Sequence, residues 1–275
     1  PANVVVPVAD RSGGGGRSQS TTVYISAFAV KDDGCQIAVG LRSGKVLVVS
    51  GDLGDPFFQL DKANAYSTIH VDETVKKPSA IPMPVTCLYF GTSYSDPPQQ
   101  SGTRLFVTAE RASNPRRRSS EREEPLGVVV CYNTTHAAPF PAVLLDDERG
   151  CAEQCAALNP KDHELVVGRD EGACYFTFED RTWAFSLDGR KQAVATLSDN
   201  FISDLVVVAS HNEQSRRTDV NIYDLKNKFV AFNFRLGPDQ HVARILTGYT
   251  APTSKQQHTA NHGPNACSTA FVLVV

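Results

Sequence analysis

The stretch 193–234, AVATLSDNFISDLVVVASHNEQSRRTDVNIYDLKNKFVAFNF, decides the fold. It contains short apolar or alternating runs that are each closed by polar residues, and it lacks the three-to-four-residue apolar spacing of a helix. The runs are Ala193–Leu197, Ile202–Ala209, Val220–Asp224 and Phe229–Phe234. Runs of this length, rich in Val, Ile, Phe and Tyr and bounded by turn residues, predict consecutive antiparallel strands.

Comparable groups of runs lie on both sides of this stretch. The first holds Val23–Val30, Gln36–Gly40 and Lys45–Ser50, and the second holds Val85–Phe90, Arg104–Thr108, Gly127–Tyr132 and Ala142–Leu145. The third holds Cys155–Leu158, Glu164–Val167, Ala173–Phe178 and Thr182–Leu187, and the last begins at Val242–Gly248 and restarts at Ala270. Groups of about four short strands at roughly 40–50-residue spacing are typical of propeller blades. The pattern predicts an all-β, WD40-like β-propeller of about four to five blades. A β-sandwich would have similar strands but would not favour groups of four.

Polar segments interrupt the regular spacing. We expect residues 1–22 to form a flexible linker, because Arg11–Ser20 is rich in Gly, Ser and Arg. Residues 23–275 are expected to form a partial propeller domain with polar insertions at 92–103, 109–125 and 251–268. These insertions contain too little apolar surface to offset the entropy of ordering, so we expect them to be exposed and mobile.

The composition is that of an ordinary globular protein. Of the 275 residues, 41% are hydrophobic and 21% are charged, which excludes a collagen, a disulfide miniprotein and a wholly disordered chain. The net charge of −3 provides no general attraction to nucleic acid or to an anionic membrane. The longest apolar runs, such as Leu205–Ala209, are strand-sized and far shorter than a membrane span.

Two further features concern the compartment and the ends of the chain. Most of the seven cysteines sit inside strand-like runs, which predicts buried free thiols in a reducing, cytosolic compartment. The sequence opens at Pro1, and its last apolar run stops at Val275. We therefore expect the chain to be part of a longer protein.

Three groups of residues resemble ligand sites, but ordinary turns or loops explain them better. Gly40–Val46 has three residues between its glycines and Val after Lys45, whereas a phosphate-binding loop needs four and a Ser or Thr. A hairpin closed by Gly44 explains it better. Cys151 and Cys155 are three residues apart with no second pair, and His258, His262 and Cys267 lie in a polar loop without a fourth ligand. We expect no metal or cofactor-binding site.

Catalytic patterns are equally weak. There is no Gly-x-Ser-x-Gly turn, and His163 precedes a strand as part of a polar turn. Asp146, Asp147 and Glu148 adjoin in one turn, whereas paired catalytic carboxylates need separate carriers that face one cleft. We predict that the chain is not an enzyme and has no catalytic residues.

Two further motifs match sites of covalent modification. Arg116–Arg118 are followed by Ser119, Ser120 and several glutamates, which predicts a solvated loop rather than a nucleic-acid patch, with the two serines as hypothetical phosphorylation sites. Asn133–Thr135 matches a glycosylation acceptor, which would matter only in a secreted protein.

Whole strands provide a more specific signal. The stretch 220–231 resembles the NIYDL-x-NKF segment of the vacuolar protein sorting-associated protein 11 family, a core subunit of the class C tethering complexes HOPS and CORVET. Other matching stretches follow the family's order from about Val23 to Val275. They are Ala27–Leu41, Ser43–Val46, Gly51–Leu53, Leu105–Thr108, the GC-x-x-x-C segment at Gly150–Leu158, and Val166–Glu171.

The resemblance implies the amino-terminal part of a family plan in which a seven-bladed propeller precedes an α-solenoid and a RING zinc domain. The earliest blades, the solenoid and the RING appear in none of these residues, so no zinc role is carried over. The three insertions depart from the family pattern, which leaves partner contacts of those loops unassigned.

The function implied by the resemblance is that of a non-enzymatic scaffold or adaptor in vesicle docking and fusion at endosomes and lysosomes or vacuoles. Implied partners are the other class C core subunits and, indirectly, Rab GTPases and SNAREs, with a cytoplasmic location peripheral to the membrane. The alternatives are a propeller of a coat or ciliary-transport scaffold and a propeller hydrolase. For packing between blades, the large rings of Trp183, Tyr223 and Phe229 are the best candidates.

Overall fold

The computed structural model describes residues 24–50, 66–74, 82–93, 102–111, 127–135, 140–146, 149–159, 164–169, 172–176, 181–186, 189–197, 205–224, 227–250 and 269–275. These residues form antiparallel strands and one short 3-10 helix, η1 (Val71–Thr74), and no α-helix occurs among them. The chain divides into two compact units, Pro1–Cys151 and Ala152–Val275. The predicted linker 1–22 lies outside the described residues.

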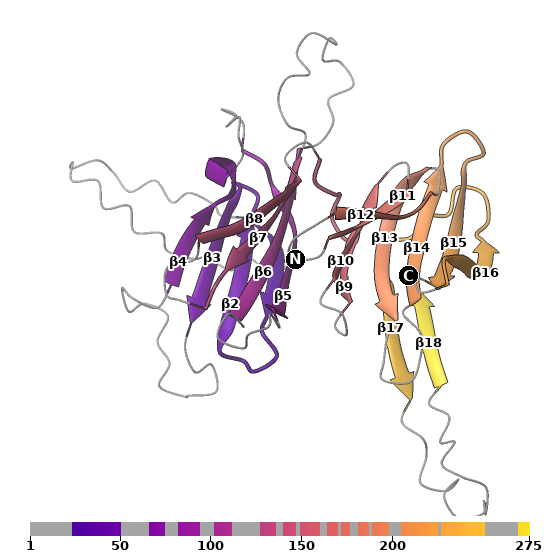
Figure 1. Ribbon diagram of the computed structural model, residues 1–275. Coiled ribbons are helices and arrows are strands. Elements are labelled where there is room, and N and C mark those ends of the chain that lie inside the picture. The colour runs from indigo at the N-terminus through magenta and orange to yellow at the C-terminus, as the bar shows by residue number, and fades with distance from the viewer. Residues whose placement is uncertain are drawn as a thin grey trace, which may run out of the picture. The chain divides into compact units, whose positions relative to one another are not determined.

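Two four-stranded sheets make up the first unit (Figure 1). One follows chain order through β1 (Ile25–Val30), β2 (Gln36–Leu41), β3 (Lys45–Ser50) and β4 (Tyr66–His70). The other follows chain order through β5 (Val85–Ser93), β6 (Gly102–Glu110), β7 (Gly127–Asn133) and β8 (Phe140–Asp146). All neighbouring pairs are antiparallel, as expected for strands joined by hairpins.

The second unit contains two four-stranded sheets and one pair of strands. The first sheet is built from β9 (Ala156–Asn159), β10 (Glu164–Arg169), β11 (Gly172–Phe176) and β12 (Arg181–Ser186). The next is built from β13 (Arg190–Leu197), β14 (Leu205–Asn212), β15 (Arg217–Asp224) and β16 (Phe229–Arg235). The pair is β17 (Ile245–Thr250) and β18 (Thr269–Val274).

The predicted grouping of strands is confirmed, because each predicted group coincides with one sheet. Within each unit the first strands of successive sheets are neighbours: β1 contacts β5, β9 contacts β13, and β13 contacts β17. This is the arrangement of propeller blades, whose first strands meet around a common axis. The prediction missed β4, whose sequence Tyr-Ser-Thr-Ile-His alternates too weakly to stand out between polar segments.

Two of the predicted insertions have strand residues at their ends. The β5–β6 ladder continues to the pairs Thr92–Thr103 and Ser93–Gly102, and the β6–β7 ladder begins at the pair Glu110–Gly127. The central residues of these segments, and all of 251–268, lie outside the described residues.

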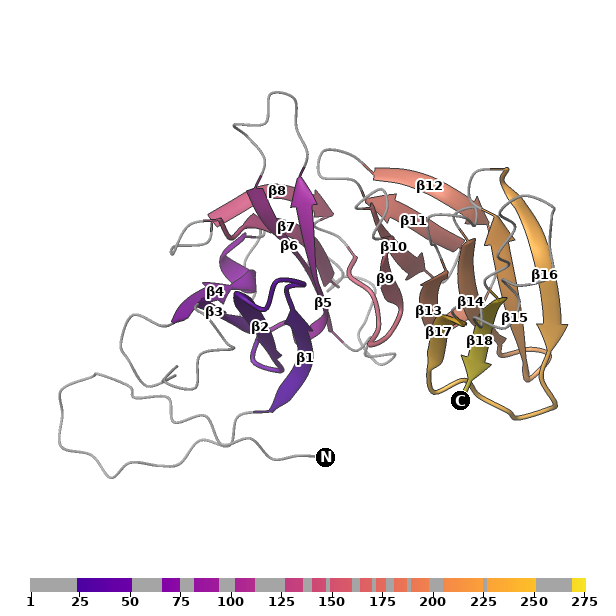
Figure 2. The same ribbon diagram turned by 90° about the horizontal axis from the view of Figure 1, so that it is seen from below.

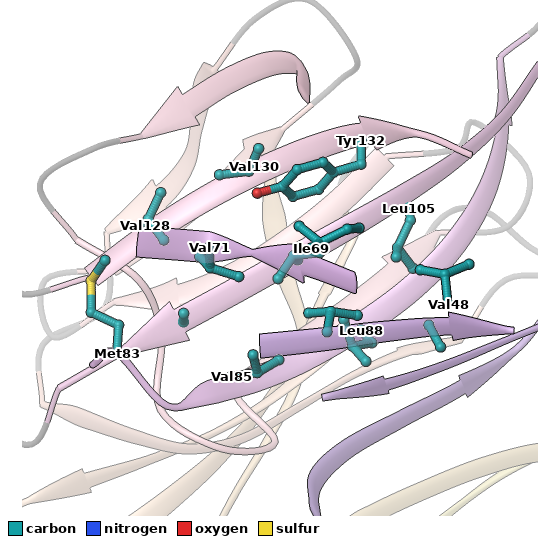
Figure 3. Close-up of a cluster of buried hydrophobic side chains, with 14 residues drawn as sticks. Val48, Ile69, Val71, Met83, Val85, Leu88, Leu105, Val128, Val130 and Tyr132 are labelled. Carbon is teal, nitrogen blue, oxygen red and sulfur yellow. The ribbon is translucent and has the colours of Figure 1, made fainter. Parts of the chain in front are cut away.

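The core of the first unit fills the space between its two sheets. Figure 3 shows side chains of both sheets that point toward one another, with Tyr132 lying across the aliphatic groups. The largest members are buried almost completely: Val48, Ile69, Val71, Met83, Val85, Leu88, Leu105, Val128, Val130 and Tyr132. Most of them are β-branched, which suits side chains that stand on a pleated surface.

Glycine meets specific backbone demands at two places. Gly44 has φ of 79° in the β2–β3 turn and donates its N–H to Leu41 O at 3.1 Å, so the hairpin interpretation of Gly40–Val46 is confirmed. Gly150 packs so closely on Ala109 O that an added Cβ would overlap it. The glycine of the GC-x-x-x-C segment is therefore required by close chain approach.

The two cysteines of that segment belong to different units. Cys151 Sγ lies 3.4 Å from Thr108 Oγ1 in the first unit, and Cys155 Sγ lies 3.1 Å from Lys191 O in the second. Both side chains are buried thiols outside any disulfide, as are those of Cys87 and Cys131, whereas Cys35 is exposed. The predicted burial of thiols is confirmed for these four described residues.

The predicted packing residues have different environments. Tyr223 is only 6% exposed and packs with Val166, Val206 and Val208, so its predicted burial is confirmed. The prediction for Phe229 was wrong, because this side chain is 51% exposed at the start of the outermost strand of its sheet. Trp183 lies in β12, and its side chain is outside what the structure describes.

This difference between two aromatic residues is testable by truncation. We expect Tyr223→Ala to lower the free energy of unfolding by about 3–5 kcal/mol, because it removes a buried ring and leaves a cavity. The matched variant Phe229→Ala removes an exposed ring and should cost less than about 1 kcal/mol. Urea unfolding followed by circular dichroism measures both, and equal losses would contradict the assigned environments.

Thiol reactivity provides a second test. Burial raises the pKa of Cys131 to about 12, and the nearby Arg104 charge offsets only part of that effect. At pH 8 this thiol stays protonated in the folded protein, and only a thiolate reacts as a nucleophile. Iodoacetamide at pH 8 should therefore label Cys35 and spare Cys131, while both react in 8 M urea. Peptide mass spectrometry measures the labelling, and rapid modification of Cys131 in the native protein would refute its burial.

Candidate docking surface

The NIYDL stretch occupies β15 and is buried on both sides of its sheet. Tyr223 packs into one core cluster, and Val220 packs with Val242 and Ile245 in another. Burial also raises the pKa of the Tyr223 phenol to about 12. Because successive strand residues face opposite sides, this strand separates two apolar layers.

The end of the same motif shapes the turn into β16. Asp224 Oδ1 accepts a hydrogen bond from Asn227 N at 2.9 Å, and Asp224 Oδ2 accepts one from Asn227 Nδ2 at 3.0 Å. Lys228 then adopts φ of 58°, a left-handed conformation common in turns. Hairpin geometry therefore explains Asp224 and Asn227 of the motif.

β16 is the outermost strand of its sheet (Figure 2). It carries exposed apolar side chains. Phe229, Val230 and Phe232 are 51%, 46% and 57% exposed, and the rings of Phe232 and Phe234 lie 6.1 Å apart. Clustered exposed apolar side chains are typical of interaction surfaces, whereas single ones are common everywhere. We call Phe229 and Phe232 the β16 surface, because their ladder partners Asp224 and Ile222 share one face of β15, whereas Val230 pairs with Tyr223 on the other face.

Polar pairs hold this edge strand in register. Arg235 donates to both carboxylate oxygens of Asp219, at 2.6 Å and 3.3 Å, and this contact holds the pKa of the guanidinium above its usual value. Asn233 Nδ2 also donates to Asn221 Oδ1. These cross-strand bonds fix the register of β16 against β15. The register decides which side chains lie on each face of the sheet, because a one-residue slip would exchange the two faces.

Two other strips of exposed apolar residues occur among the described residues. In the first unit, β1 exposes Phe28 and Val30, with Tyr24 directly before the strand. In the second unit, Leu246 of β17 and Leu273 of β18 are exposed, as is Val275. Exposed apolar strips of this kind are suited to contacts with other proteins.

The residues weighed as ligand or catalytic candidates do not converge on a site where they are described. Asp146 Oδ1 accepts a hydrogen bond from Arg149 N at 3.1 Å within a turn. Among the described residues, His, Cys, Asp and Glu form no group of three or more that could hold a metal ion. Several candidates lie outside the described residues: Arg116–Ser120, Asp147, Glu148, His163, His258, His262 and Cys267.

The glycosylation-like motif forms a turn. Asn133 Oδ1 accepts a hydrogen bond from Thr135 N at 3.0 Å, and Thr135 Oγ1 accepts one from Thr103 N at 3.0 Å. Thr134 is buried and donates to Gln36 Oε1 at 3.2 Å. This motif is accounted for by local structure.

Sequence reasoning did not single out the β16 surface as exposed. Its available signal was the series Phe229, Phe232 and Phe234, which is too apolar for the outward face of a solvated edge strand.

Within the described residues, no helix has the length and hydrophobicity required to cross a membrane.

Comparison with known proteins bears on the identity of the chain. Residues 126–250 match the family model described as PEP5/VPS11 N-terminal, a segment that includes β15 and the β16 surface. A curated relative, the vacuolar protein sorting-associated protein 11 homolog of Dictyostelium discoideum, is 22% identical over 252 residues and covers 80% of this chain. The chain spans 23% of that relative's length.

Solved structures support the fold. The Dos1 propeller aligns with a TM-score of 0.53 and 12% identity over 81% of this chain and 50% of its own. A BBS1N chain crystallised in complex with ARL6DN aligns with a TM-score of 0.50 and 14% identity over 90% of this chain and 60% of its own. At such identity the likeness concerns the fold alone, and the predicted β-propeller is confirmed.

The family model and the curated relative support the assignment of this chain to the amino-terminal propeller region of the VPS11 family, so the resemblance seen in the NIYDL stretch is confirmed.

Proposed function

We propose that this chain is a non-enzymatic scaffold region of a membrane-tethering complex subunit that acts in vesicle docking and fusion at endosomes and lysosomes or vacuoles. The observation that carries the proposal is the PEP5/VPS11 N-terminal match across residues 126–250. The curated relative, named for vacuolar protein sorting, supports the same process. The coat or ciliary-transport alternative is less favoured, because the family match and the curated relative both concern vacuolar protein sorting, while the solved structures share only the fold.

The proposed role requires rigid surfaces and no turnover. The sheets are held by antiparallel ladders with buried cores, and such a scaffold presents side chains at defined positions. The proposed partners are the other class C core subunits of HOPS and CORVET, with Rab GTPases and SNAREs engaged indirectly through the complex. In this proposal the protein is cytoplasmic, peripheral to endosomal and lysosomal or vacuolar membranes, and does not bind nucleic acid.

The β16 surface is the part of the chain that we propose for contact with another subunit. Its exposed aromatic side chains belong to the residue types that contribute most to protein interfaces. It lies within the segment matched by the family model, and cross-strand bonds hold it in place. Two aromatic rings on a rigid edge bind with little loss of conformational freedom.

Affinity purification from cells tests the proposed function. We expect the tagged 275-residue chain to recover other class C core subunits, identified by quantitative mass spectrometry. Recovery of a coat or ciliary-transport complex in their place would refute the proposal, and so would recovery of no tethering subunit at all.

A surface variant tests the contact separately. Phe229→Ser combined with Phe232→Ser should reduce recovery of at least one subunit about tenfold, since interface aromatic residues commonly contribute 1–2 kcal/mol or more. The matched control Leu246→Ser with Leu273→Ser alters two exposed apolar residues of β17 and β18. Unchanged recovery with the β16 variant would show that another surface makes the contact.

A further inference from the structure

The first sheet of the first unit, β1–β4, is apolar on both faces. One face packs into the core shared with β5–β8 through side chains such as Ala38 and Val48. On the opposite face, Phe28 pairs with Val39 and Val39 pairs with Leu47, so these three side chains form a row across β1, β2 and β3. Strands that are apolar on both faces are typical of sheets covered on both sides.

A second apolar row lies beside the first. Val30 pairs with Ile37, and Ile37 pairs with Val49, so this row also crosses β1, β2 and β3. The first row ends at Thr68 of β4, which pairs with Leu47. An antiparallel sheet with one face in water normally has polar residues on that face, and this one has two rows of aliphatic and aromatic side chains.

Exposure is greatest at β1, the first strand of this sheet (Figure 2). Phe28 and Val30 are 58% and 48% exposed, and Tyr24, directly before β1, is 60% exposed. Ile37 and Val39 of β2 are half-buried. We call Phe28, Val30, Ile37 and Val39 the β1 face. A contiguous apolar surface of this kind indicates a missing contact.

The beginning of the chain contains a segment of matching character. Residues 3–8 read NVVVPV, and no charged side chain occurs before Asp10. The Gly, Ser and Arg composition that predicts a linker begins only at Arg11, so the valines are not explained by it. Valine favours an extended backbone, and Pro7 is compatible with a strand only at an edge or outside a ladder. This run therefore suits an extended segment laid on a sheet face.

The tether is long enough to bring this segment to the β1 face. Seventeen positions separate Val8 from Ile25, which gives a reach of roughly 55 Å in extended form. Four strands at about 4.8 Å spacing are only about 15 Å wide. Residues 13–16 are four consecutive glycines, which allow the chain to reverse. A flexible tether also gives an effective concentration in the millimolar range, far above that of a second copy in dilute solution.

Charge does not oppose the contact. The β1 face and residues 1–9 carry no charged side chain, so bringing them together removes none from water. The nearest charges of the β1–β2 turn, Lys31 and Asp33, form their own ion pair at 2.6 Å. The free energy of the contact is then that of apolar burial, to which valine against Phe28 and Val30 is suited.

We propose that residues 3–8 fold back as an extended segment over the β1 face of the same chain, with their valines against Phe28 and Val30. Residues 9–23 then form the linker. The segment shields an apolar sheet face that would otherwise associate with other sheets. This inference is independent of the proposed tethering role.

Photo-crosslinking on the 275-residue chain tests the contact directly. With p-benzoylphenylalanine in place of Val5, irradiation should join the amino-terminal peptide to peptides of β1 or β2, identified by mass spectrometry. An equal mixture of chains labelled with ¹⁴N and ¹⁵N separates contacts within one chain from contacts between copies. The proposal is overturned if no cross-link reaches β1 or β2, or if the cross-linked peptides carry mixed labels, which would identify a second copy as the occupant.

A pair of surface variants tests the side chains involved. Phe28→Ser with Val30→Ser should lower the yield of this cross-link at least fivefold, because the apolar partners of the segment are removed. The matched control Leu246→Ser with Leu273→Ser alters two exposed apolar residues of the second unit and should leave the yield unchanged. Equal yields from the two pairs would contradict the assigned contact.

Amide hydrogen exchange gives a readout without a cross-linker. Replacement of Val4, Val5 and Val6 by serine should lower the protection of residues 25–41 at least tenfold. A tenfold change corresponds to about 1.4 kcal/mol, no more than the burial of a single valine contributes. Protection of β14 in the second unit should stay constant and serves as the control. Unchanged protection of residues 25–41 would overturn the proposal.

Discussion

Burial of β14 on both faces is the constraint on which the second unit depends. Val206 and Val208 enter one core cluster with Val166 and Tyr223, while Val207 and Ala209 enter another with Val242 and Ile245. A strand that is apolar on both faces cannot serve a sheet that has one face in water. The sheet β13–β16 must therefore be covered by β9–β12 on one side and by β17–β18 on the other, which dictates the stacked arrangement of a propeller. The same logic holds for β6 and β7 in the first unit, where Leu105–Ala109 and Val128–Tyr132 are buried throughout.

The edge strand of the same sheet is far less buried than its inner strands. β16 pairs with β15 on one side, and its other edge has no neighbouring strand among the described residues. Burial falls from the middle of the sheet to this edge, and the aromatic residues there are left on the surface. Bonds such as Arg235–Asp219 maintain the strand without apolar cover. The edge is thus ordered and apolar at once, which is the combination that suits a docking role.

The connection after β16 shows how a fold built on apolar stacking is completed by polar contacts. Residues 236–244 are held by hydrogen bonds to Gln192 of β13 and Thr218 of β15, by backbone bonds between Arg244 and Val275, and by the buried side chain of Val242. Hydrogen bonds of this kind are individually worth about 1 kcal/mol.

Much of the architecture was determined by the sequence alone. The strand groups follow from runs of β-branched residues closed by turn residues, because alternation and turn chemistry act over a few neighbouring positions. The NIYDL stretch likewise showed the resemblance to the VPS11 family without knowledge of any contact. Only the tertiary structure decided which aromatic residues were buried, because Tyr223 and Phe229 both lie in apolar strand-like runs and occupy an inner and an edge strand. It also decided that Gln192 meets His241, because 49 positions separate them in the chain and a bulge brings them together. Exposure and long-range polar contact depend on which strands are neighbours in space, and local sequence patterns carry no information about that order.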